Sequence, residues 1–193
     1  MTRRNRRRSI IATASLCISL LSAAAIATTI IRMDLKTLAQ SAPLIFRAKC
    51  ASTDSRWEPG AIWTFDEFDV LETFKGEPPQ RLRIRLPGGR VGHTETKIEG
   101  VPHFTPGEEV VLFAEPTSAG DYGVTSWAQG TFRVHRDAAG GDARLTQDTA
   151  HFAVFDPASR KFVTVGIRDI SLSDFRQKIT EALSSSSARN RQP

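Results

Sequence analysis

His93 and His103 lie close together in the central part of the chain, with Glu95 and Glu99 between them. Imidazole and carboxylate groups bind zinc in hydrolytic enzymes, where protein ligands leave one position open for water. A metal-dependent hydrolase that uses His93 and His103 is therefore one hypothesis. The sequence contains no HExxH motif, and nothing in it fixes a third ligand. Two surface histidines are the preferred interpretation, and we expect neither a metal nor another cofactor.

Two other groups of residues could carry chemistry. The pair Gly88-Gly89 resembles a phosphate-binding loop, but such a loop needs the N-terminus of a helix behind it. The residues that follow, HTETKIEG, alternate as a strand does, so we interpret the glycines as positions of turn geometry and close backbone approach. Asp66 and Glu67 would suit glycoside chemistry as a carboxylate pair. Adjacent strand residues point to opposite faces, which favours surface charge.

Aromatic and thiol side chains offer weaker signals. Trp57, Trp63 and Trp127 would give a carbohydrate-binding module its aromatic platform, although packing is the more ordinary use of tryptophan. Cys17 lies in the N-terminal segment, which leaves Cys50 without an intrachain partner. We predict that Cys50 packs as a small apolar strand residue.

The pattern of the body of the chain, 34–170, predicts a series of short strands. These strands must position the candidate residues described above. RLRIRL alternates apolar residues with arginines, which is typical of a half-buried antiparallel strand. EEVVLF is apolar at both parities, which predicts a strand buried on both faces. Turn residues recur at regular spacing and no long crossover intervenes. The pattern predicts a mainly β fold, a small closed or partly open antiparallel barrel of the OB-like kind.

Helices are expected only at the two ends of this body. DLKTLAQSA predicts a short N-terminal helix that ends before Pro43. Ser171 precedes Asp174 with the spacing of a helix N-cap, and an apolar stripe follows, so a C-terminal helix is predicted over 171–184. The polar segment 185–193 is predicted to be disordered. Phe104 is expected in the core, with Pro106-Gly107 setting the turn into the next strand.

The N-terminal segment has the layout of an export signal. Five arginines precede an uncharged run from Ser9 to Ile31, in which small residues gather near the end. We predict a signal peptide over 1–27, or an uncleaved anchor if the run remains in the bilayer. Either alternative places the following domain outside the cytoplasm, as a periplasmic, secreted or membrane-anchored protein.

The positive charge of the chain belongs to this segment. The whole chain has 26 basic and 21 acidic residues, and removing the five leader arginines leaves 21 of each, a net charge of zero. The basic balance therefore serves targeting, and we expect no binding of nucleic acid by the domain itself.

Five stretches occur in order between Asp34 and Val134: LKTLAQSAPLIFRAKCASTDSRW, FDVLETFKGE, LRIRLPGGRVG, GVPHFTPGEEVVLFAEP and YGVTSWAQGTFRV. Their pattern resembles a family of exported, mostly uncharacterised bacterial β-domain proteins, and similar domains occur beside matrixin-type metalloproteases. The strand order is also similar to that of netrin-like domains of metalloprotease inhibitors, which are OB-fold barrels. The resemblance implies export and an OB-like fold. The paired cysteines of netrin-like domains are missing here, so an inhibitory mechanism does not follow.

The sequence therefore favours an exported, non-catalytic binding or interaction domain whose partner is an extracytoplasmic protein or an envelope component. OB-like barrels bind ligands with one strand face and the loops beside it. The loop around Trp57 and the crossing from Gly88 to Phe104 provide the candidate binding residues, which are Trp57, Arg90, His93 and His103. A metal-dependent hydrolase and a carbohydrate-binding module remain the alternatives.

Overall fold

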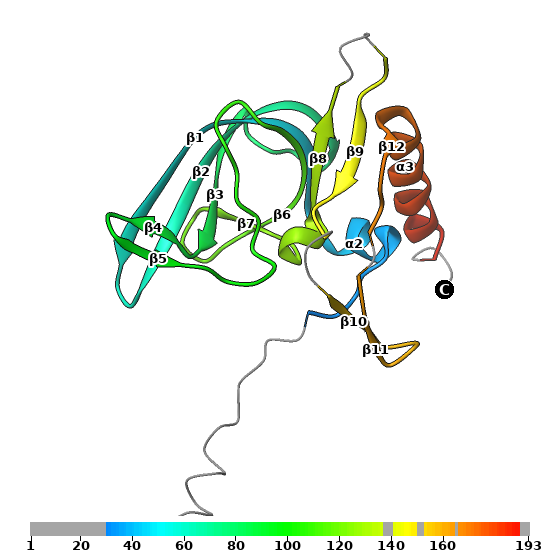
Figure 1. Cartoon of the computed structure of the whole chain (residues 1–193). Coiled ribbons are helices and arrows are strands. Elements are labelled where there is room, and N and C mark those ends of the chain that lie inside the picture. The colour runs from blue at the N-terminus through cyan, green and yellow to red at the C-terminus, as the bar shows by residue number, and fades with distance from the viewer. Residues whose placement is uncertain (1–29, 137–140, 150–152, 165, 190–193) are drawn as a thin grey trace, which may run out of the picture.

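The computed structural model describes residues 30–136, 141–149, 153–164 and 166–189 (Figure 1). The predicted signal peptide, 1–27, lies outside these ranges. The fold is mainly β, as predicted. Its elements in chain order are α2 (Leu35–Ser41), β1 (Leu44–Glu58), β2 (Ala61–Lys75), β3 (Arg81–Pro87), β4 (Gly89–Val91), β5 (Thr94–Thr96), β6 (Glu109–Pro116), β7 (Tyr122–Val124), the 3₁₀ helix η1 (Trp127–Gly130), β8 (Thr131–His135), β9 (Arg144–Gln147), β10 (Val154–Asp156), β11 (Lys161–Val163), β12 (Ile170–Ser171) and α3 (Leu172–Arg189).

Five strands form a partly closed barrel in the order β1-β2-β3-β7-β6, and β6 pairs again with β1. The prediction of an antiparallel barrel needs one correction, because β3 and β7 are parallel at Ile84 and Tyr122. The reason is geometric: an odd number of strands cannot alternate in direction around a closed ring. The remaining four pairings are antiparallel. This order is that of an OB-like Greek-key barrel.

Strand β6 is buried on both faces, as its sequence predicts. Val110 and Leu112 face the barrel interior, where they join the cluster that includes Phe46, Phe68 and Ile84. Val111 and Phe113 face the other way and belong to a second cluster. The strand is therefore the wall shared by two cores, which explains why both parities of EEVVLF are apolar.

The second core lies between the sheet extension and the two helices (Figure 1). Beyond β6 the sheet continues as β8-β9-β12, and Phe175 of α3 contacts Phe113 and Phe132 at ring-centroid distances of 6.3 and 5.1 Å. Leu38 and Ala39 bury the inner face of α2. The aromatic contacts of α3 and the packing of α2 cover the face of the sheet that points away from the barrel interior.

Helix α3 begins where the sequence predicts and continues past residue 184. The Ser171 hydroxyl accepts a hydrogen bond from the backbone N–H of Asp174 at 3.0 Å, which caps the helix. The helix extends through Arg189 into the segment predicted to be disordered. Ser184 and Ser185 donate from their hydroxyls to the carbonyls of Glu181 and Ala182, so serines there bond back to the preceding turn instead of ending the helix.

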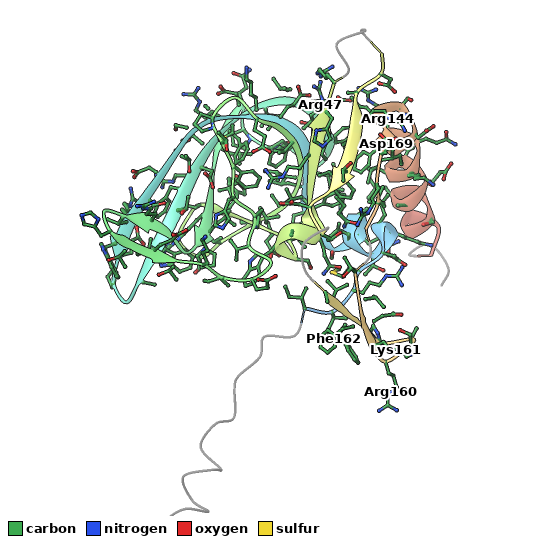
Figure 2. The ribbon with its side chains drawn as sticks, in the orientation of Figure 1. Arg47, Arg144, Arg160, Lys161, Phe162 and Asp169 are labelled. Atoms are coloured by element: carbon green, nitrogen blue, oxygen red, sulfur yellow. The ribbon has the colours of Figure 1, made fainter. Side chains whose placement is uncertain are left out.

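A small hairpin, β10–β11, projects from the domain beside the first described residues (Figure 2). The described residues of the three apolar clusters all lie at or after Ile30, so a chain that begins at Thr28 includes all of them. Within the described ranges, no helix combines the length and the apolar character needed to cross a bilayer.

Candidate functional site

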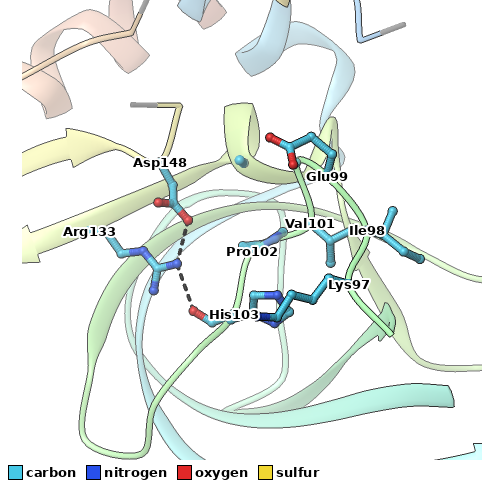
Figure 3. A pocket seen from close by; sticks show the side chains of 10 residues that line it. Lys97, Ile98, Glu99, Val101, Pro102, His103, Arg133 and Asp148 are labelled. Atoms are coloured by element: carbon cyan, nitrogen blue, oxygen red, sulfur yellow. Dashed lines mark hydrogen bonds and ion pairs between the residues drawn. The ribbon is translucent and has the colours of Figure 1, made fainter. Parts of the chain in front are cut away.

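A pocket of about 480 Å³ opens beside the loop 97–103, with Arg133 of β8 and Asp148 on its opposite wall (Figure 3). Val101 and Pro102 are buried and form an apolar side, whereas the side chains of Lys97 and Glu99 are exposed. The pocket therefore combines an apolar wall with charged groups of both signs.

The loop is fixed by local backbone chemistry. The Val101 N–H donates to the Ile98 carbonyl at 3.2 Å, and the Gly100 carbonyl accepts from the Ala128 N–H of η1 at 3.0 Å. Gly100 has φ of +80°, a conformation that glycine adopts without strain. Phe104, only 6% exposed, then enters the barrel core edge-on to Phe68, with ring centroids 5.0 Å apart. The predicted burial of Phe104 is confirmed.

Arg133 joins this loop to the sheet. Its guanidinium group donates to the Glu108 carboxylate at 2.5 Å, to the Asp148 carboxylate at 2.6 Å and to the His103 carbonyl at 2.9 Å. It also lies over the Phe104 ring, 5.0 Å from the centroid. Figure 3 shows the contacts with Asp148 and His103 at the pocket wall.

These contacts tie the pocket wall to the sheet. Burial opposes the charge of Arg133, but hydrogen bonds and ion pairs with Asp148 and Glu108 raise its pKa above the usual value. The three side chains are each less than a third exposed. Removing one member of a buried ion pair generally costs about 3–5 kcal/mol because the other charge is then left buried without a partner. The end of the loop at His103 is therefore anchored to the sheet through Arg133.

A carboxyl group lies buried in the barrel behind this wall. Asp66 is 0% exposed, and neither carboxyl oxygen has a hydrogen-bond partner among the described residues. Burial raises its pKa to about 6, and Glu108 adds to the rise; the Thr53 hydroxyl and Arg133 oppose it. The Thr53 hydroxyl is near enough to lower the pKa of Asp66, although no hydrogen bond joins the two side chains. The interpretation of Asp66 as surface charge is wrong.

The sequence held a signal for this burial. Asp66 has the parity of Ile62 and Phe68, and the pairing of β2 with β3 runs without a shift from Trp63 to Asp69. The register shift nearest Asp66 in the β1–β2 pairing lies on the β1 side, between Cys50 and Ser52. A polar residue in an otherwise buried parity marks an interior charge. Cys50 faces the same interior, as predicted, and burial raises the pKa of its thiol to about 11.

The structure separates the four predicted binding residues into two places. Trp57 is 58% exposed near the end of β1. Arg90 lies exposed on β4, and His93 lies exposed in the turn that leads to β5. Strand β4 packs against β1 and β2, so the β4–β5 hairpin with Arg90 and His93 lies beside the β1–β2 hairpin, which carries Trp57 (Figure 1). His103 alone lines the pocket.

Glycines allow this packing of hairpins, as the sequence predicts. Gly89 has φ of +122°, and a Cβ there would lie 2.2 Å from Thr64 Oγ1 and 2.5 Å from Ser55 Oγ. The Thr64 hydroxyl donates to the Gly88 carbonyl at 2.8 Å. Close backbone approach, rather than anion binding, accounts for the glycine pair.

The arrangement gives no support to the two alternative site chemistries. Among the described residues, no group of three histidine, cysteine, aspartate or glutamate side chains is placed to hold a metal. The register of β1 with β2 places Trp57 and Trp63 on opposite faces of the sheet. Trp127 packs against the barrel core. The three tryptophans thus form no common platform.

The arginines that alternate along β3 do not form a free cationic surface. Arg85 donates to Glu58 at 2.7 Å and stacks over Trp63, 4.0 Å from the ring centroid. Arg83 donates to Asp121 at 2.6 Å. Arg85 is thereby largely covered, whereas the sequence predicts that it faces solvent.

No family model matches this chain, and no curated protein is significantly similar to it.

Proposed function

We propose that this protein is an exported, non-catalytic binding domain whose pocket beside loop 97–103 receives a polypeptide segment of an extracytoplasmic partner. The observation that carries the proposal is the contact of Arg133 with Glu108, Asp148 and the His103 carbonyl. This contact ties one wall of the pocket to the sheet, and a site whose walls are already held in place has a lower ordering cost on binding.

The lining of the pocket suits a polypeptide. Its volume of about 480 Å³ falls within the range of roughly 300–1,000 Å³ that is usual for ligand sites. Val101 and Pro102 offer an apolar wall, and Lys97, Glu99 and Asp148 offer charges of both signs. A peptide carries apolar side chains, amide groups and both charges, so it complements all three features. A purely anionic or purely cationic ligand would meet a like charge.

The chemistry of the lining supports binding rather than catalysis. The described pocket wall includes His103 but no serine, threonine or cysteine that could act as a nucleophile beside it. Arg133 is held by two carboxylates and a carbonyl, so its charge is already balanced. Export is supported by the sequence alone, through the basic start and the uncharged run that follows it.

Affinity capture from the cell envelope of the native organism tests this proposal. A chain that begins at Thr28 serves as bait, next to a Lys97→Glu/Glu99→Lys variant that reverses both rim charges. Lys178→Glu on α3 is the matched control, because this exposed lysine lies outside the pocket. We expect one envelope protein to be retained by the wild type and the control and lost from the double variant. Equal retention by all three chains would contradict the pocket as the binding site.

A further inference from the structure

The first described residues pair with the two-stranded β10–β11 hairpin through one isolated parallel bridge. The Arg32 N–H donates to the Phe155 carbonyl, and the Phe155 N–H donates to the Ile30 carbonyl, both at 2.8 Å. Ile31 thereby pairs with Phe155 in parallel, and Phe155 pairs with Phe162 across the hairpin. Paired residues share one face of a sheet. Ile31, Phe155 and Phe162 therefore form one apolar strip.

The opposite face of this small sheet is already occupied. Val154 is buried, and Val163 and Ile30 pack with it against Ala128 of η1. The strip of Ile31, Phe155 and Phe162 therefore faces away from the domain. Phe155 and Phe162 contact each other edge to face, with ring centroids 5.5 Å apart.

The strip concentrates exposed apolar surface in one place. Large apolar side chains that are exposed number four in the described part of the chain, and two of them are Ile31 at 58% and Phe162 at 62%. The others, Trp57 and Leu71, lie on β1 and β2. Contiguous exposed apolar groups are characteristic of an interaction surface.

Positive charge lies next to the strip. Arg160 and Lys161 are exposed at the end of the hairpin, next to Phe162 in sequence, and Figure 2 shows Arg160 pointing away from the barrel. Lys161 pairs with Asp156 and so lies on the opposite face of the hairpin from Phe162. The one acidic side chain of the hairpin, Asp156, accepts from the Ser159 hydroxyl at 2.6 Å and lies 3.8 Å from Arg32. The outward charge of the hairpin is therefore positive.

We propose that this strip and the adjacent cations bind the surface of a bilayer that contains anionic phospholipid. The uncharged run Ser9–Ile31 leads directly into the strip. If the run is retained as an anchor, the strip lies where the chain leaves the bilayer. If it is removed, aromatic insertion and attraction of Arg160 and Lys161 to phosphate headgroups give reversible binding. The inference does not depend on the pocket or its ligand.

Vesicle co-sedimentation tests the inference with the chain that begins at Thr28, because the complete run would itself enter lipid. The vesicles contain phosphatidylcholine with about one lipid in three replaced by phosphatidylglycerol, and a second set contains phosphatidylcholine alone. We compare the wild type with Phe162→Ser and with Arg160→Glu/Lys161→Glu. Trp57→Ser is the matched control, an equally exposed aromatic residue on a different hairpin.

We expect the wild type and Trp57→Ser to partition equally onto the anionic vesicles. Phe162→Ser and the charge-reversal variant should each reduce partitioning by about tenfold, and neutral vesicles should bind the wild type weakly. Circular dichroism confirms that each variant is folded. Absence of wild-type binding to anionic vesicles, or wild-type binding by folded Phe162→Ser, would overturn the inference. Neither result would bear on capture of a partner by the pocket.

Discussion

Replacing Asp66 by asparagine should change the pH dependence of stability in a defined direction. The pKa of Asp66 is raised from 3.8 to about 6 by burial, so the native state holds this proton more tightly than the unfolded chain does. The neutral carboxyl makes its full contribution to the free energy of unfolding below about pH 4. This contribution declines as the pH rises to about 6. Above that pH the ionised group lies buried without a hydrogen-bond partner in the described part of the chain.

The size of the effect follows from the pKa shift. A rise of about two units corresponds to about 3 kcal/mol of lost stability when both states are ionised. About 1 kcal/mol of this is already lost near pH 4.5, so the remaining change between about pH 4.5 and pH 7 is about 2 kcal/mol. Asparagine has nearly the same shape and no charge in this range. The free energy of unfolding of Asp66→Asn, relative to the wild type, should therefore rise by that amount.

Urea unfolding followed by tryptophan fluorescence at the two pH values measures this difference. The buried amide has its own desolvation cost, but that cost is the same at both pH values and cancels. Asp69→Asn is the control, because hydrogen bonding to Arg81 lowers the pKa of Asp69. Its relative stability should change little over the same interval. An Asp66→Asn difference that does not vary with pH would refute the buried, ionisable carboxyl.

Three other substitutions test the framework around the site. Phe104→Ala should reduce the free energy of unfolding by about 3–5 kcal/mol, measured by urea titration, because the ring is buried against Phe68; unchanged stability would contradict its place in the core. Gly89→Ala should cost at least about 1–3 kcal/mol through its backbone conformation and its contact with Thr64, whereas Gly123→Ala, with nearest contact 3.6 Å, should be tolerated. Arg90→Ala and His93→Ala should each alter thermal stability by less than about 0.5 kcal/mol, and a larger loss would show a structural role for these exposed residues.

Local sequence patterns predicted a large part of this fold. The two apolar parities of β6, the Ser171 cap and the turn before Glu108 each depend on residues that are close in sequence. Gly107 has φ of +93°, and the Glu108 N–H donates to the Thr105 carbonyl at 3.0 Å, as a turn there requires. Such features can be predicted from the sequence because they depend on the types and backbone geometry of a few neighbouring residues.

The candidate site was harder to predict from the sequence because its contacts join residues that are far apart in the chain. Arg133 lies 25 residues from Glu108 and 15 from Asp148 along the chain, and no local pattern announces that they meet. The interpretation of Asp66 as surface charge was wrong because both parities of β2 carry buried residues near it. Phe65, on the parity opposite to Asp66, is 4% exposed, and Arg56 lies over its ring, 3.9 Å from the centroid.

Photo-crosslinking in the native organism tests the central claim most directly. A photoreactive amino acid replaces Lys97 at the pocket rim in one strain and Lys178 on α3 in another; both side chains are exposed, and Lys178 is not part of the pocket wall. Illumination of intact cells should give one discrete adduct with an envelope protein from position 97 and none from position 178. Absence of an adduct at position 97, or the same adducts from both positions, would contradict a binding function for this pocket.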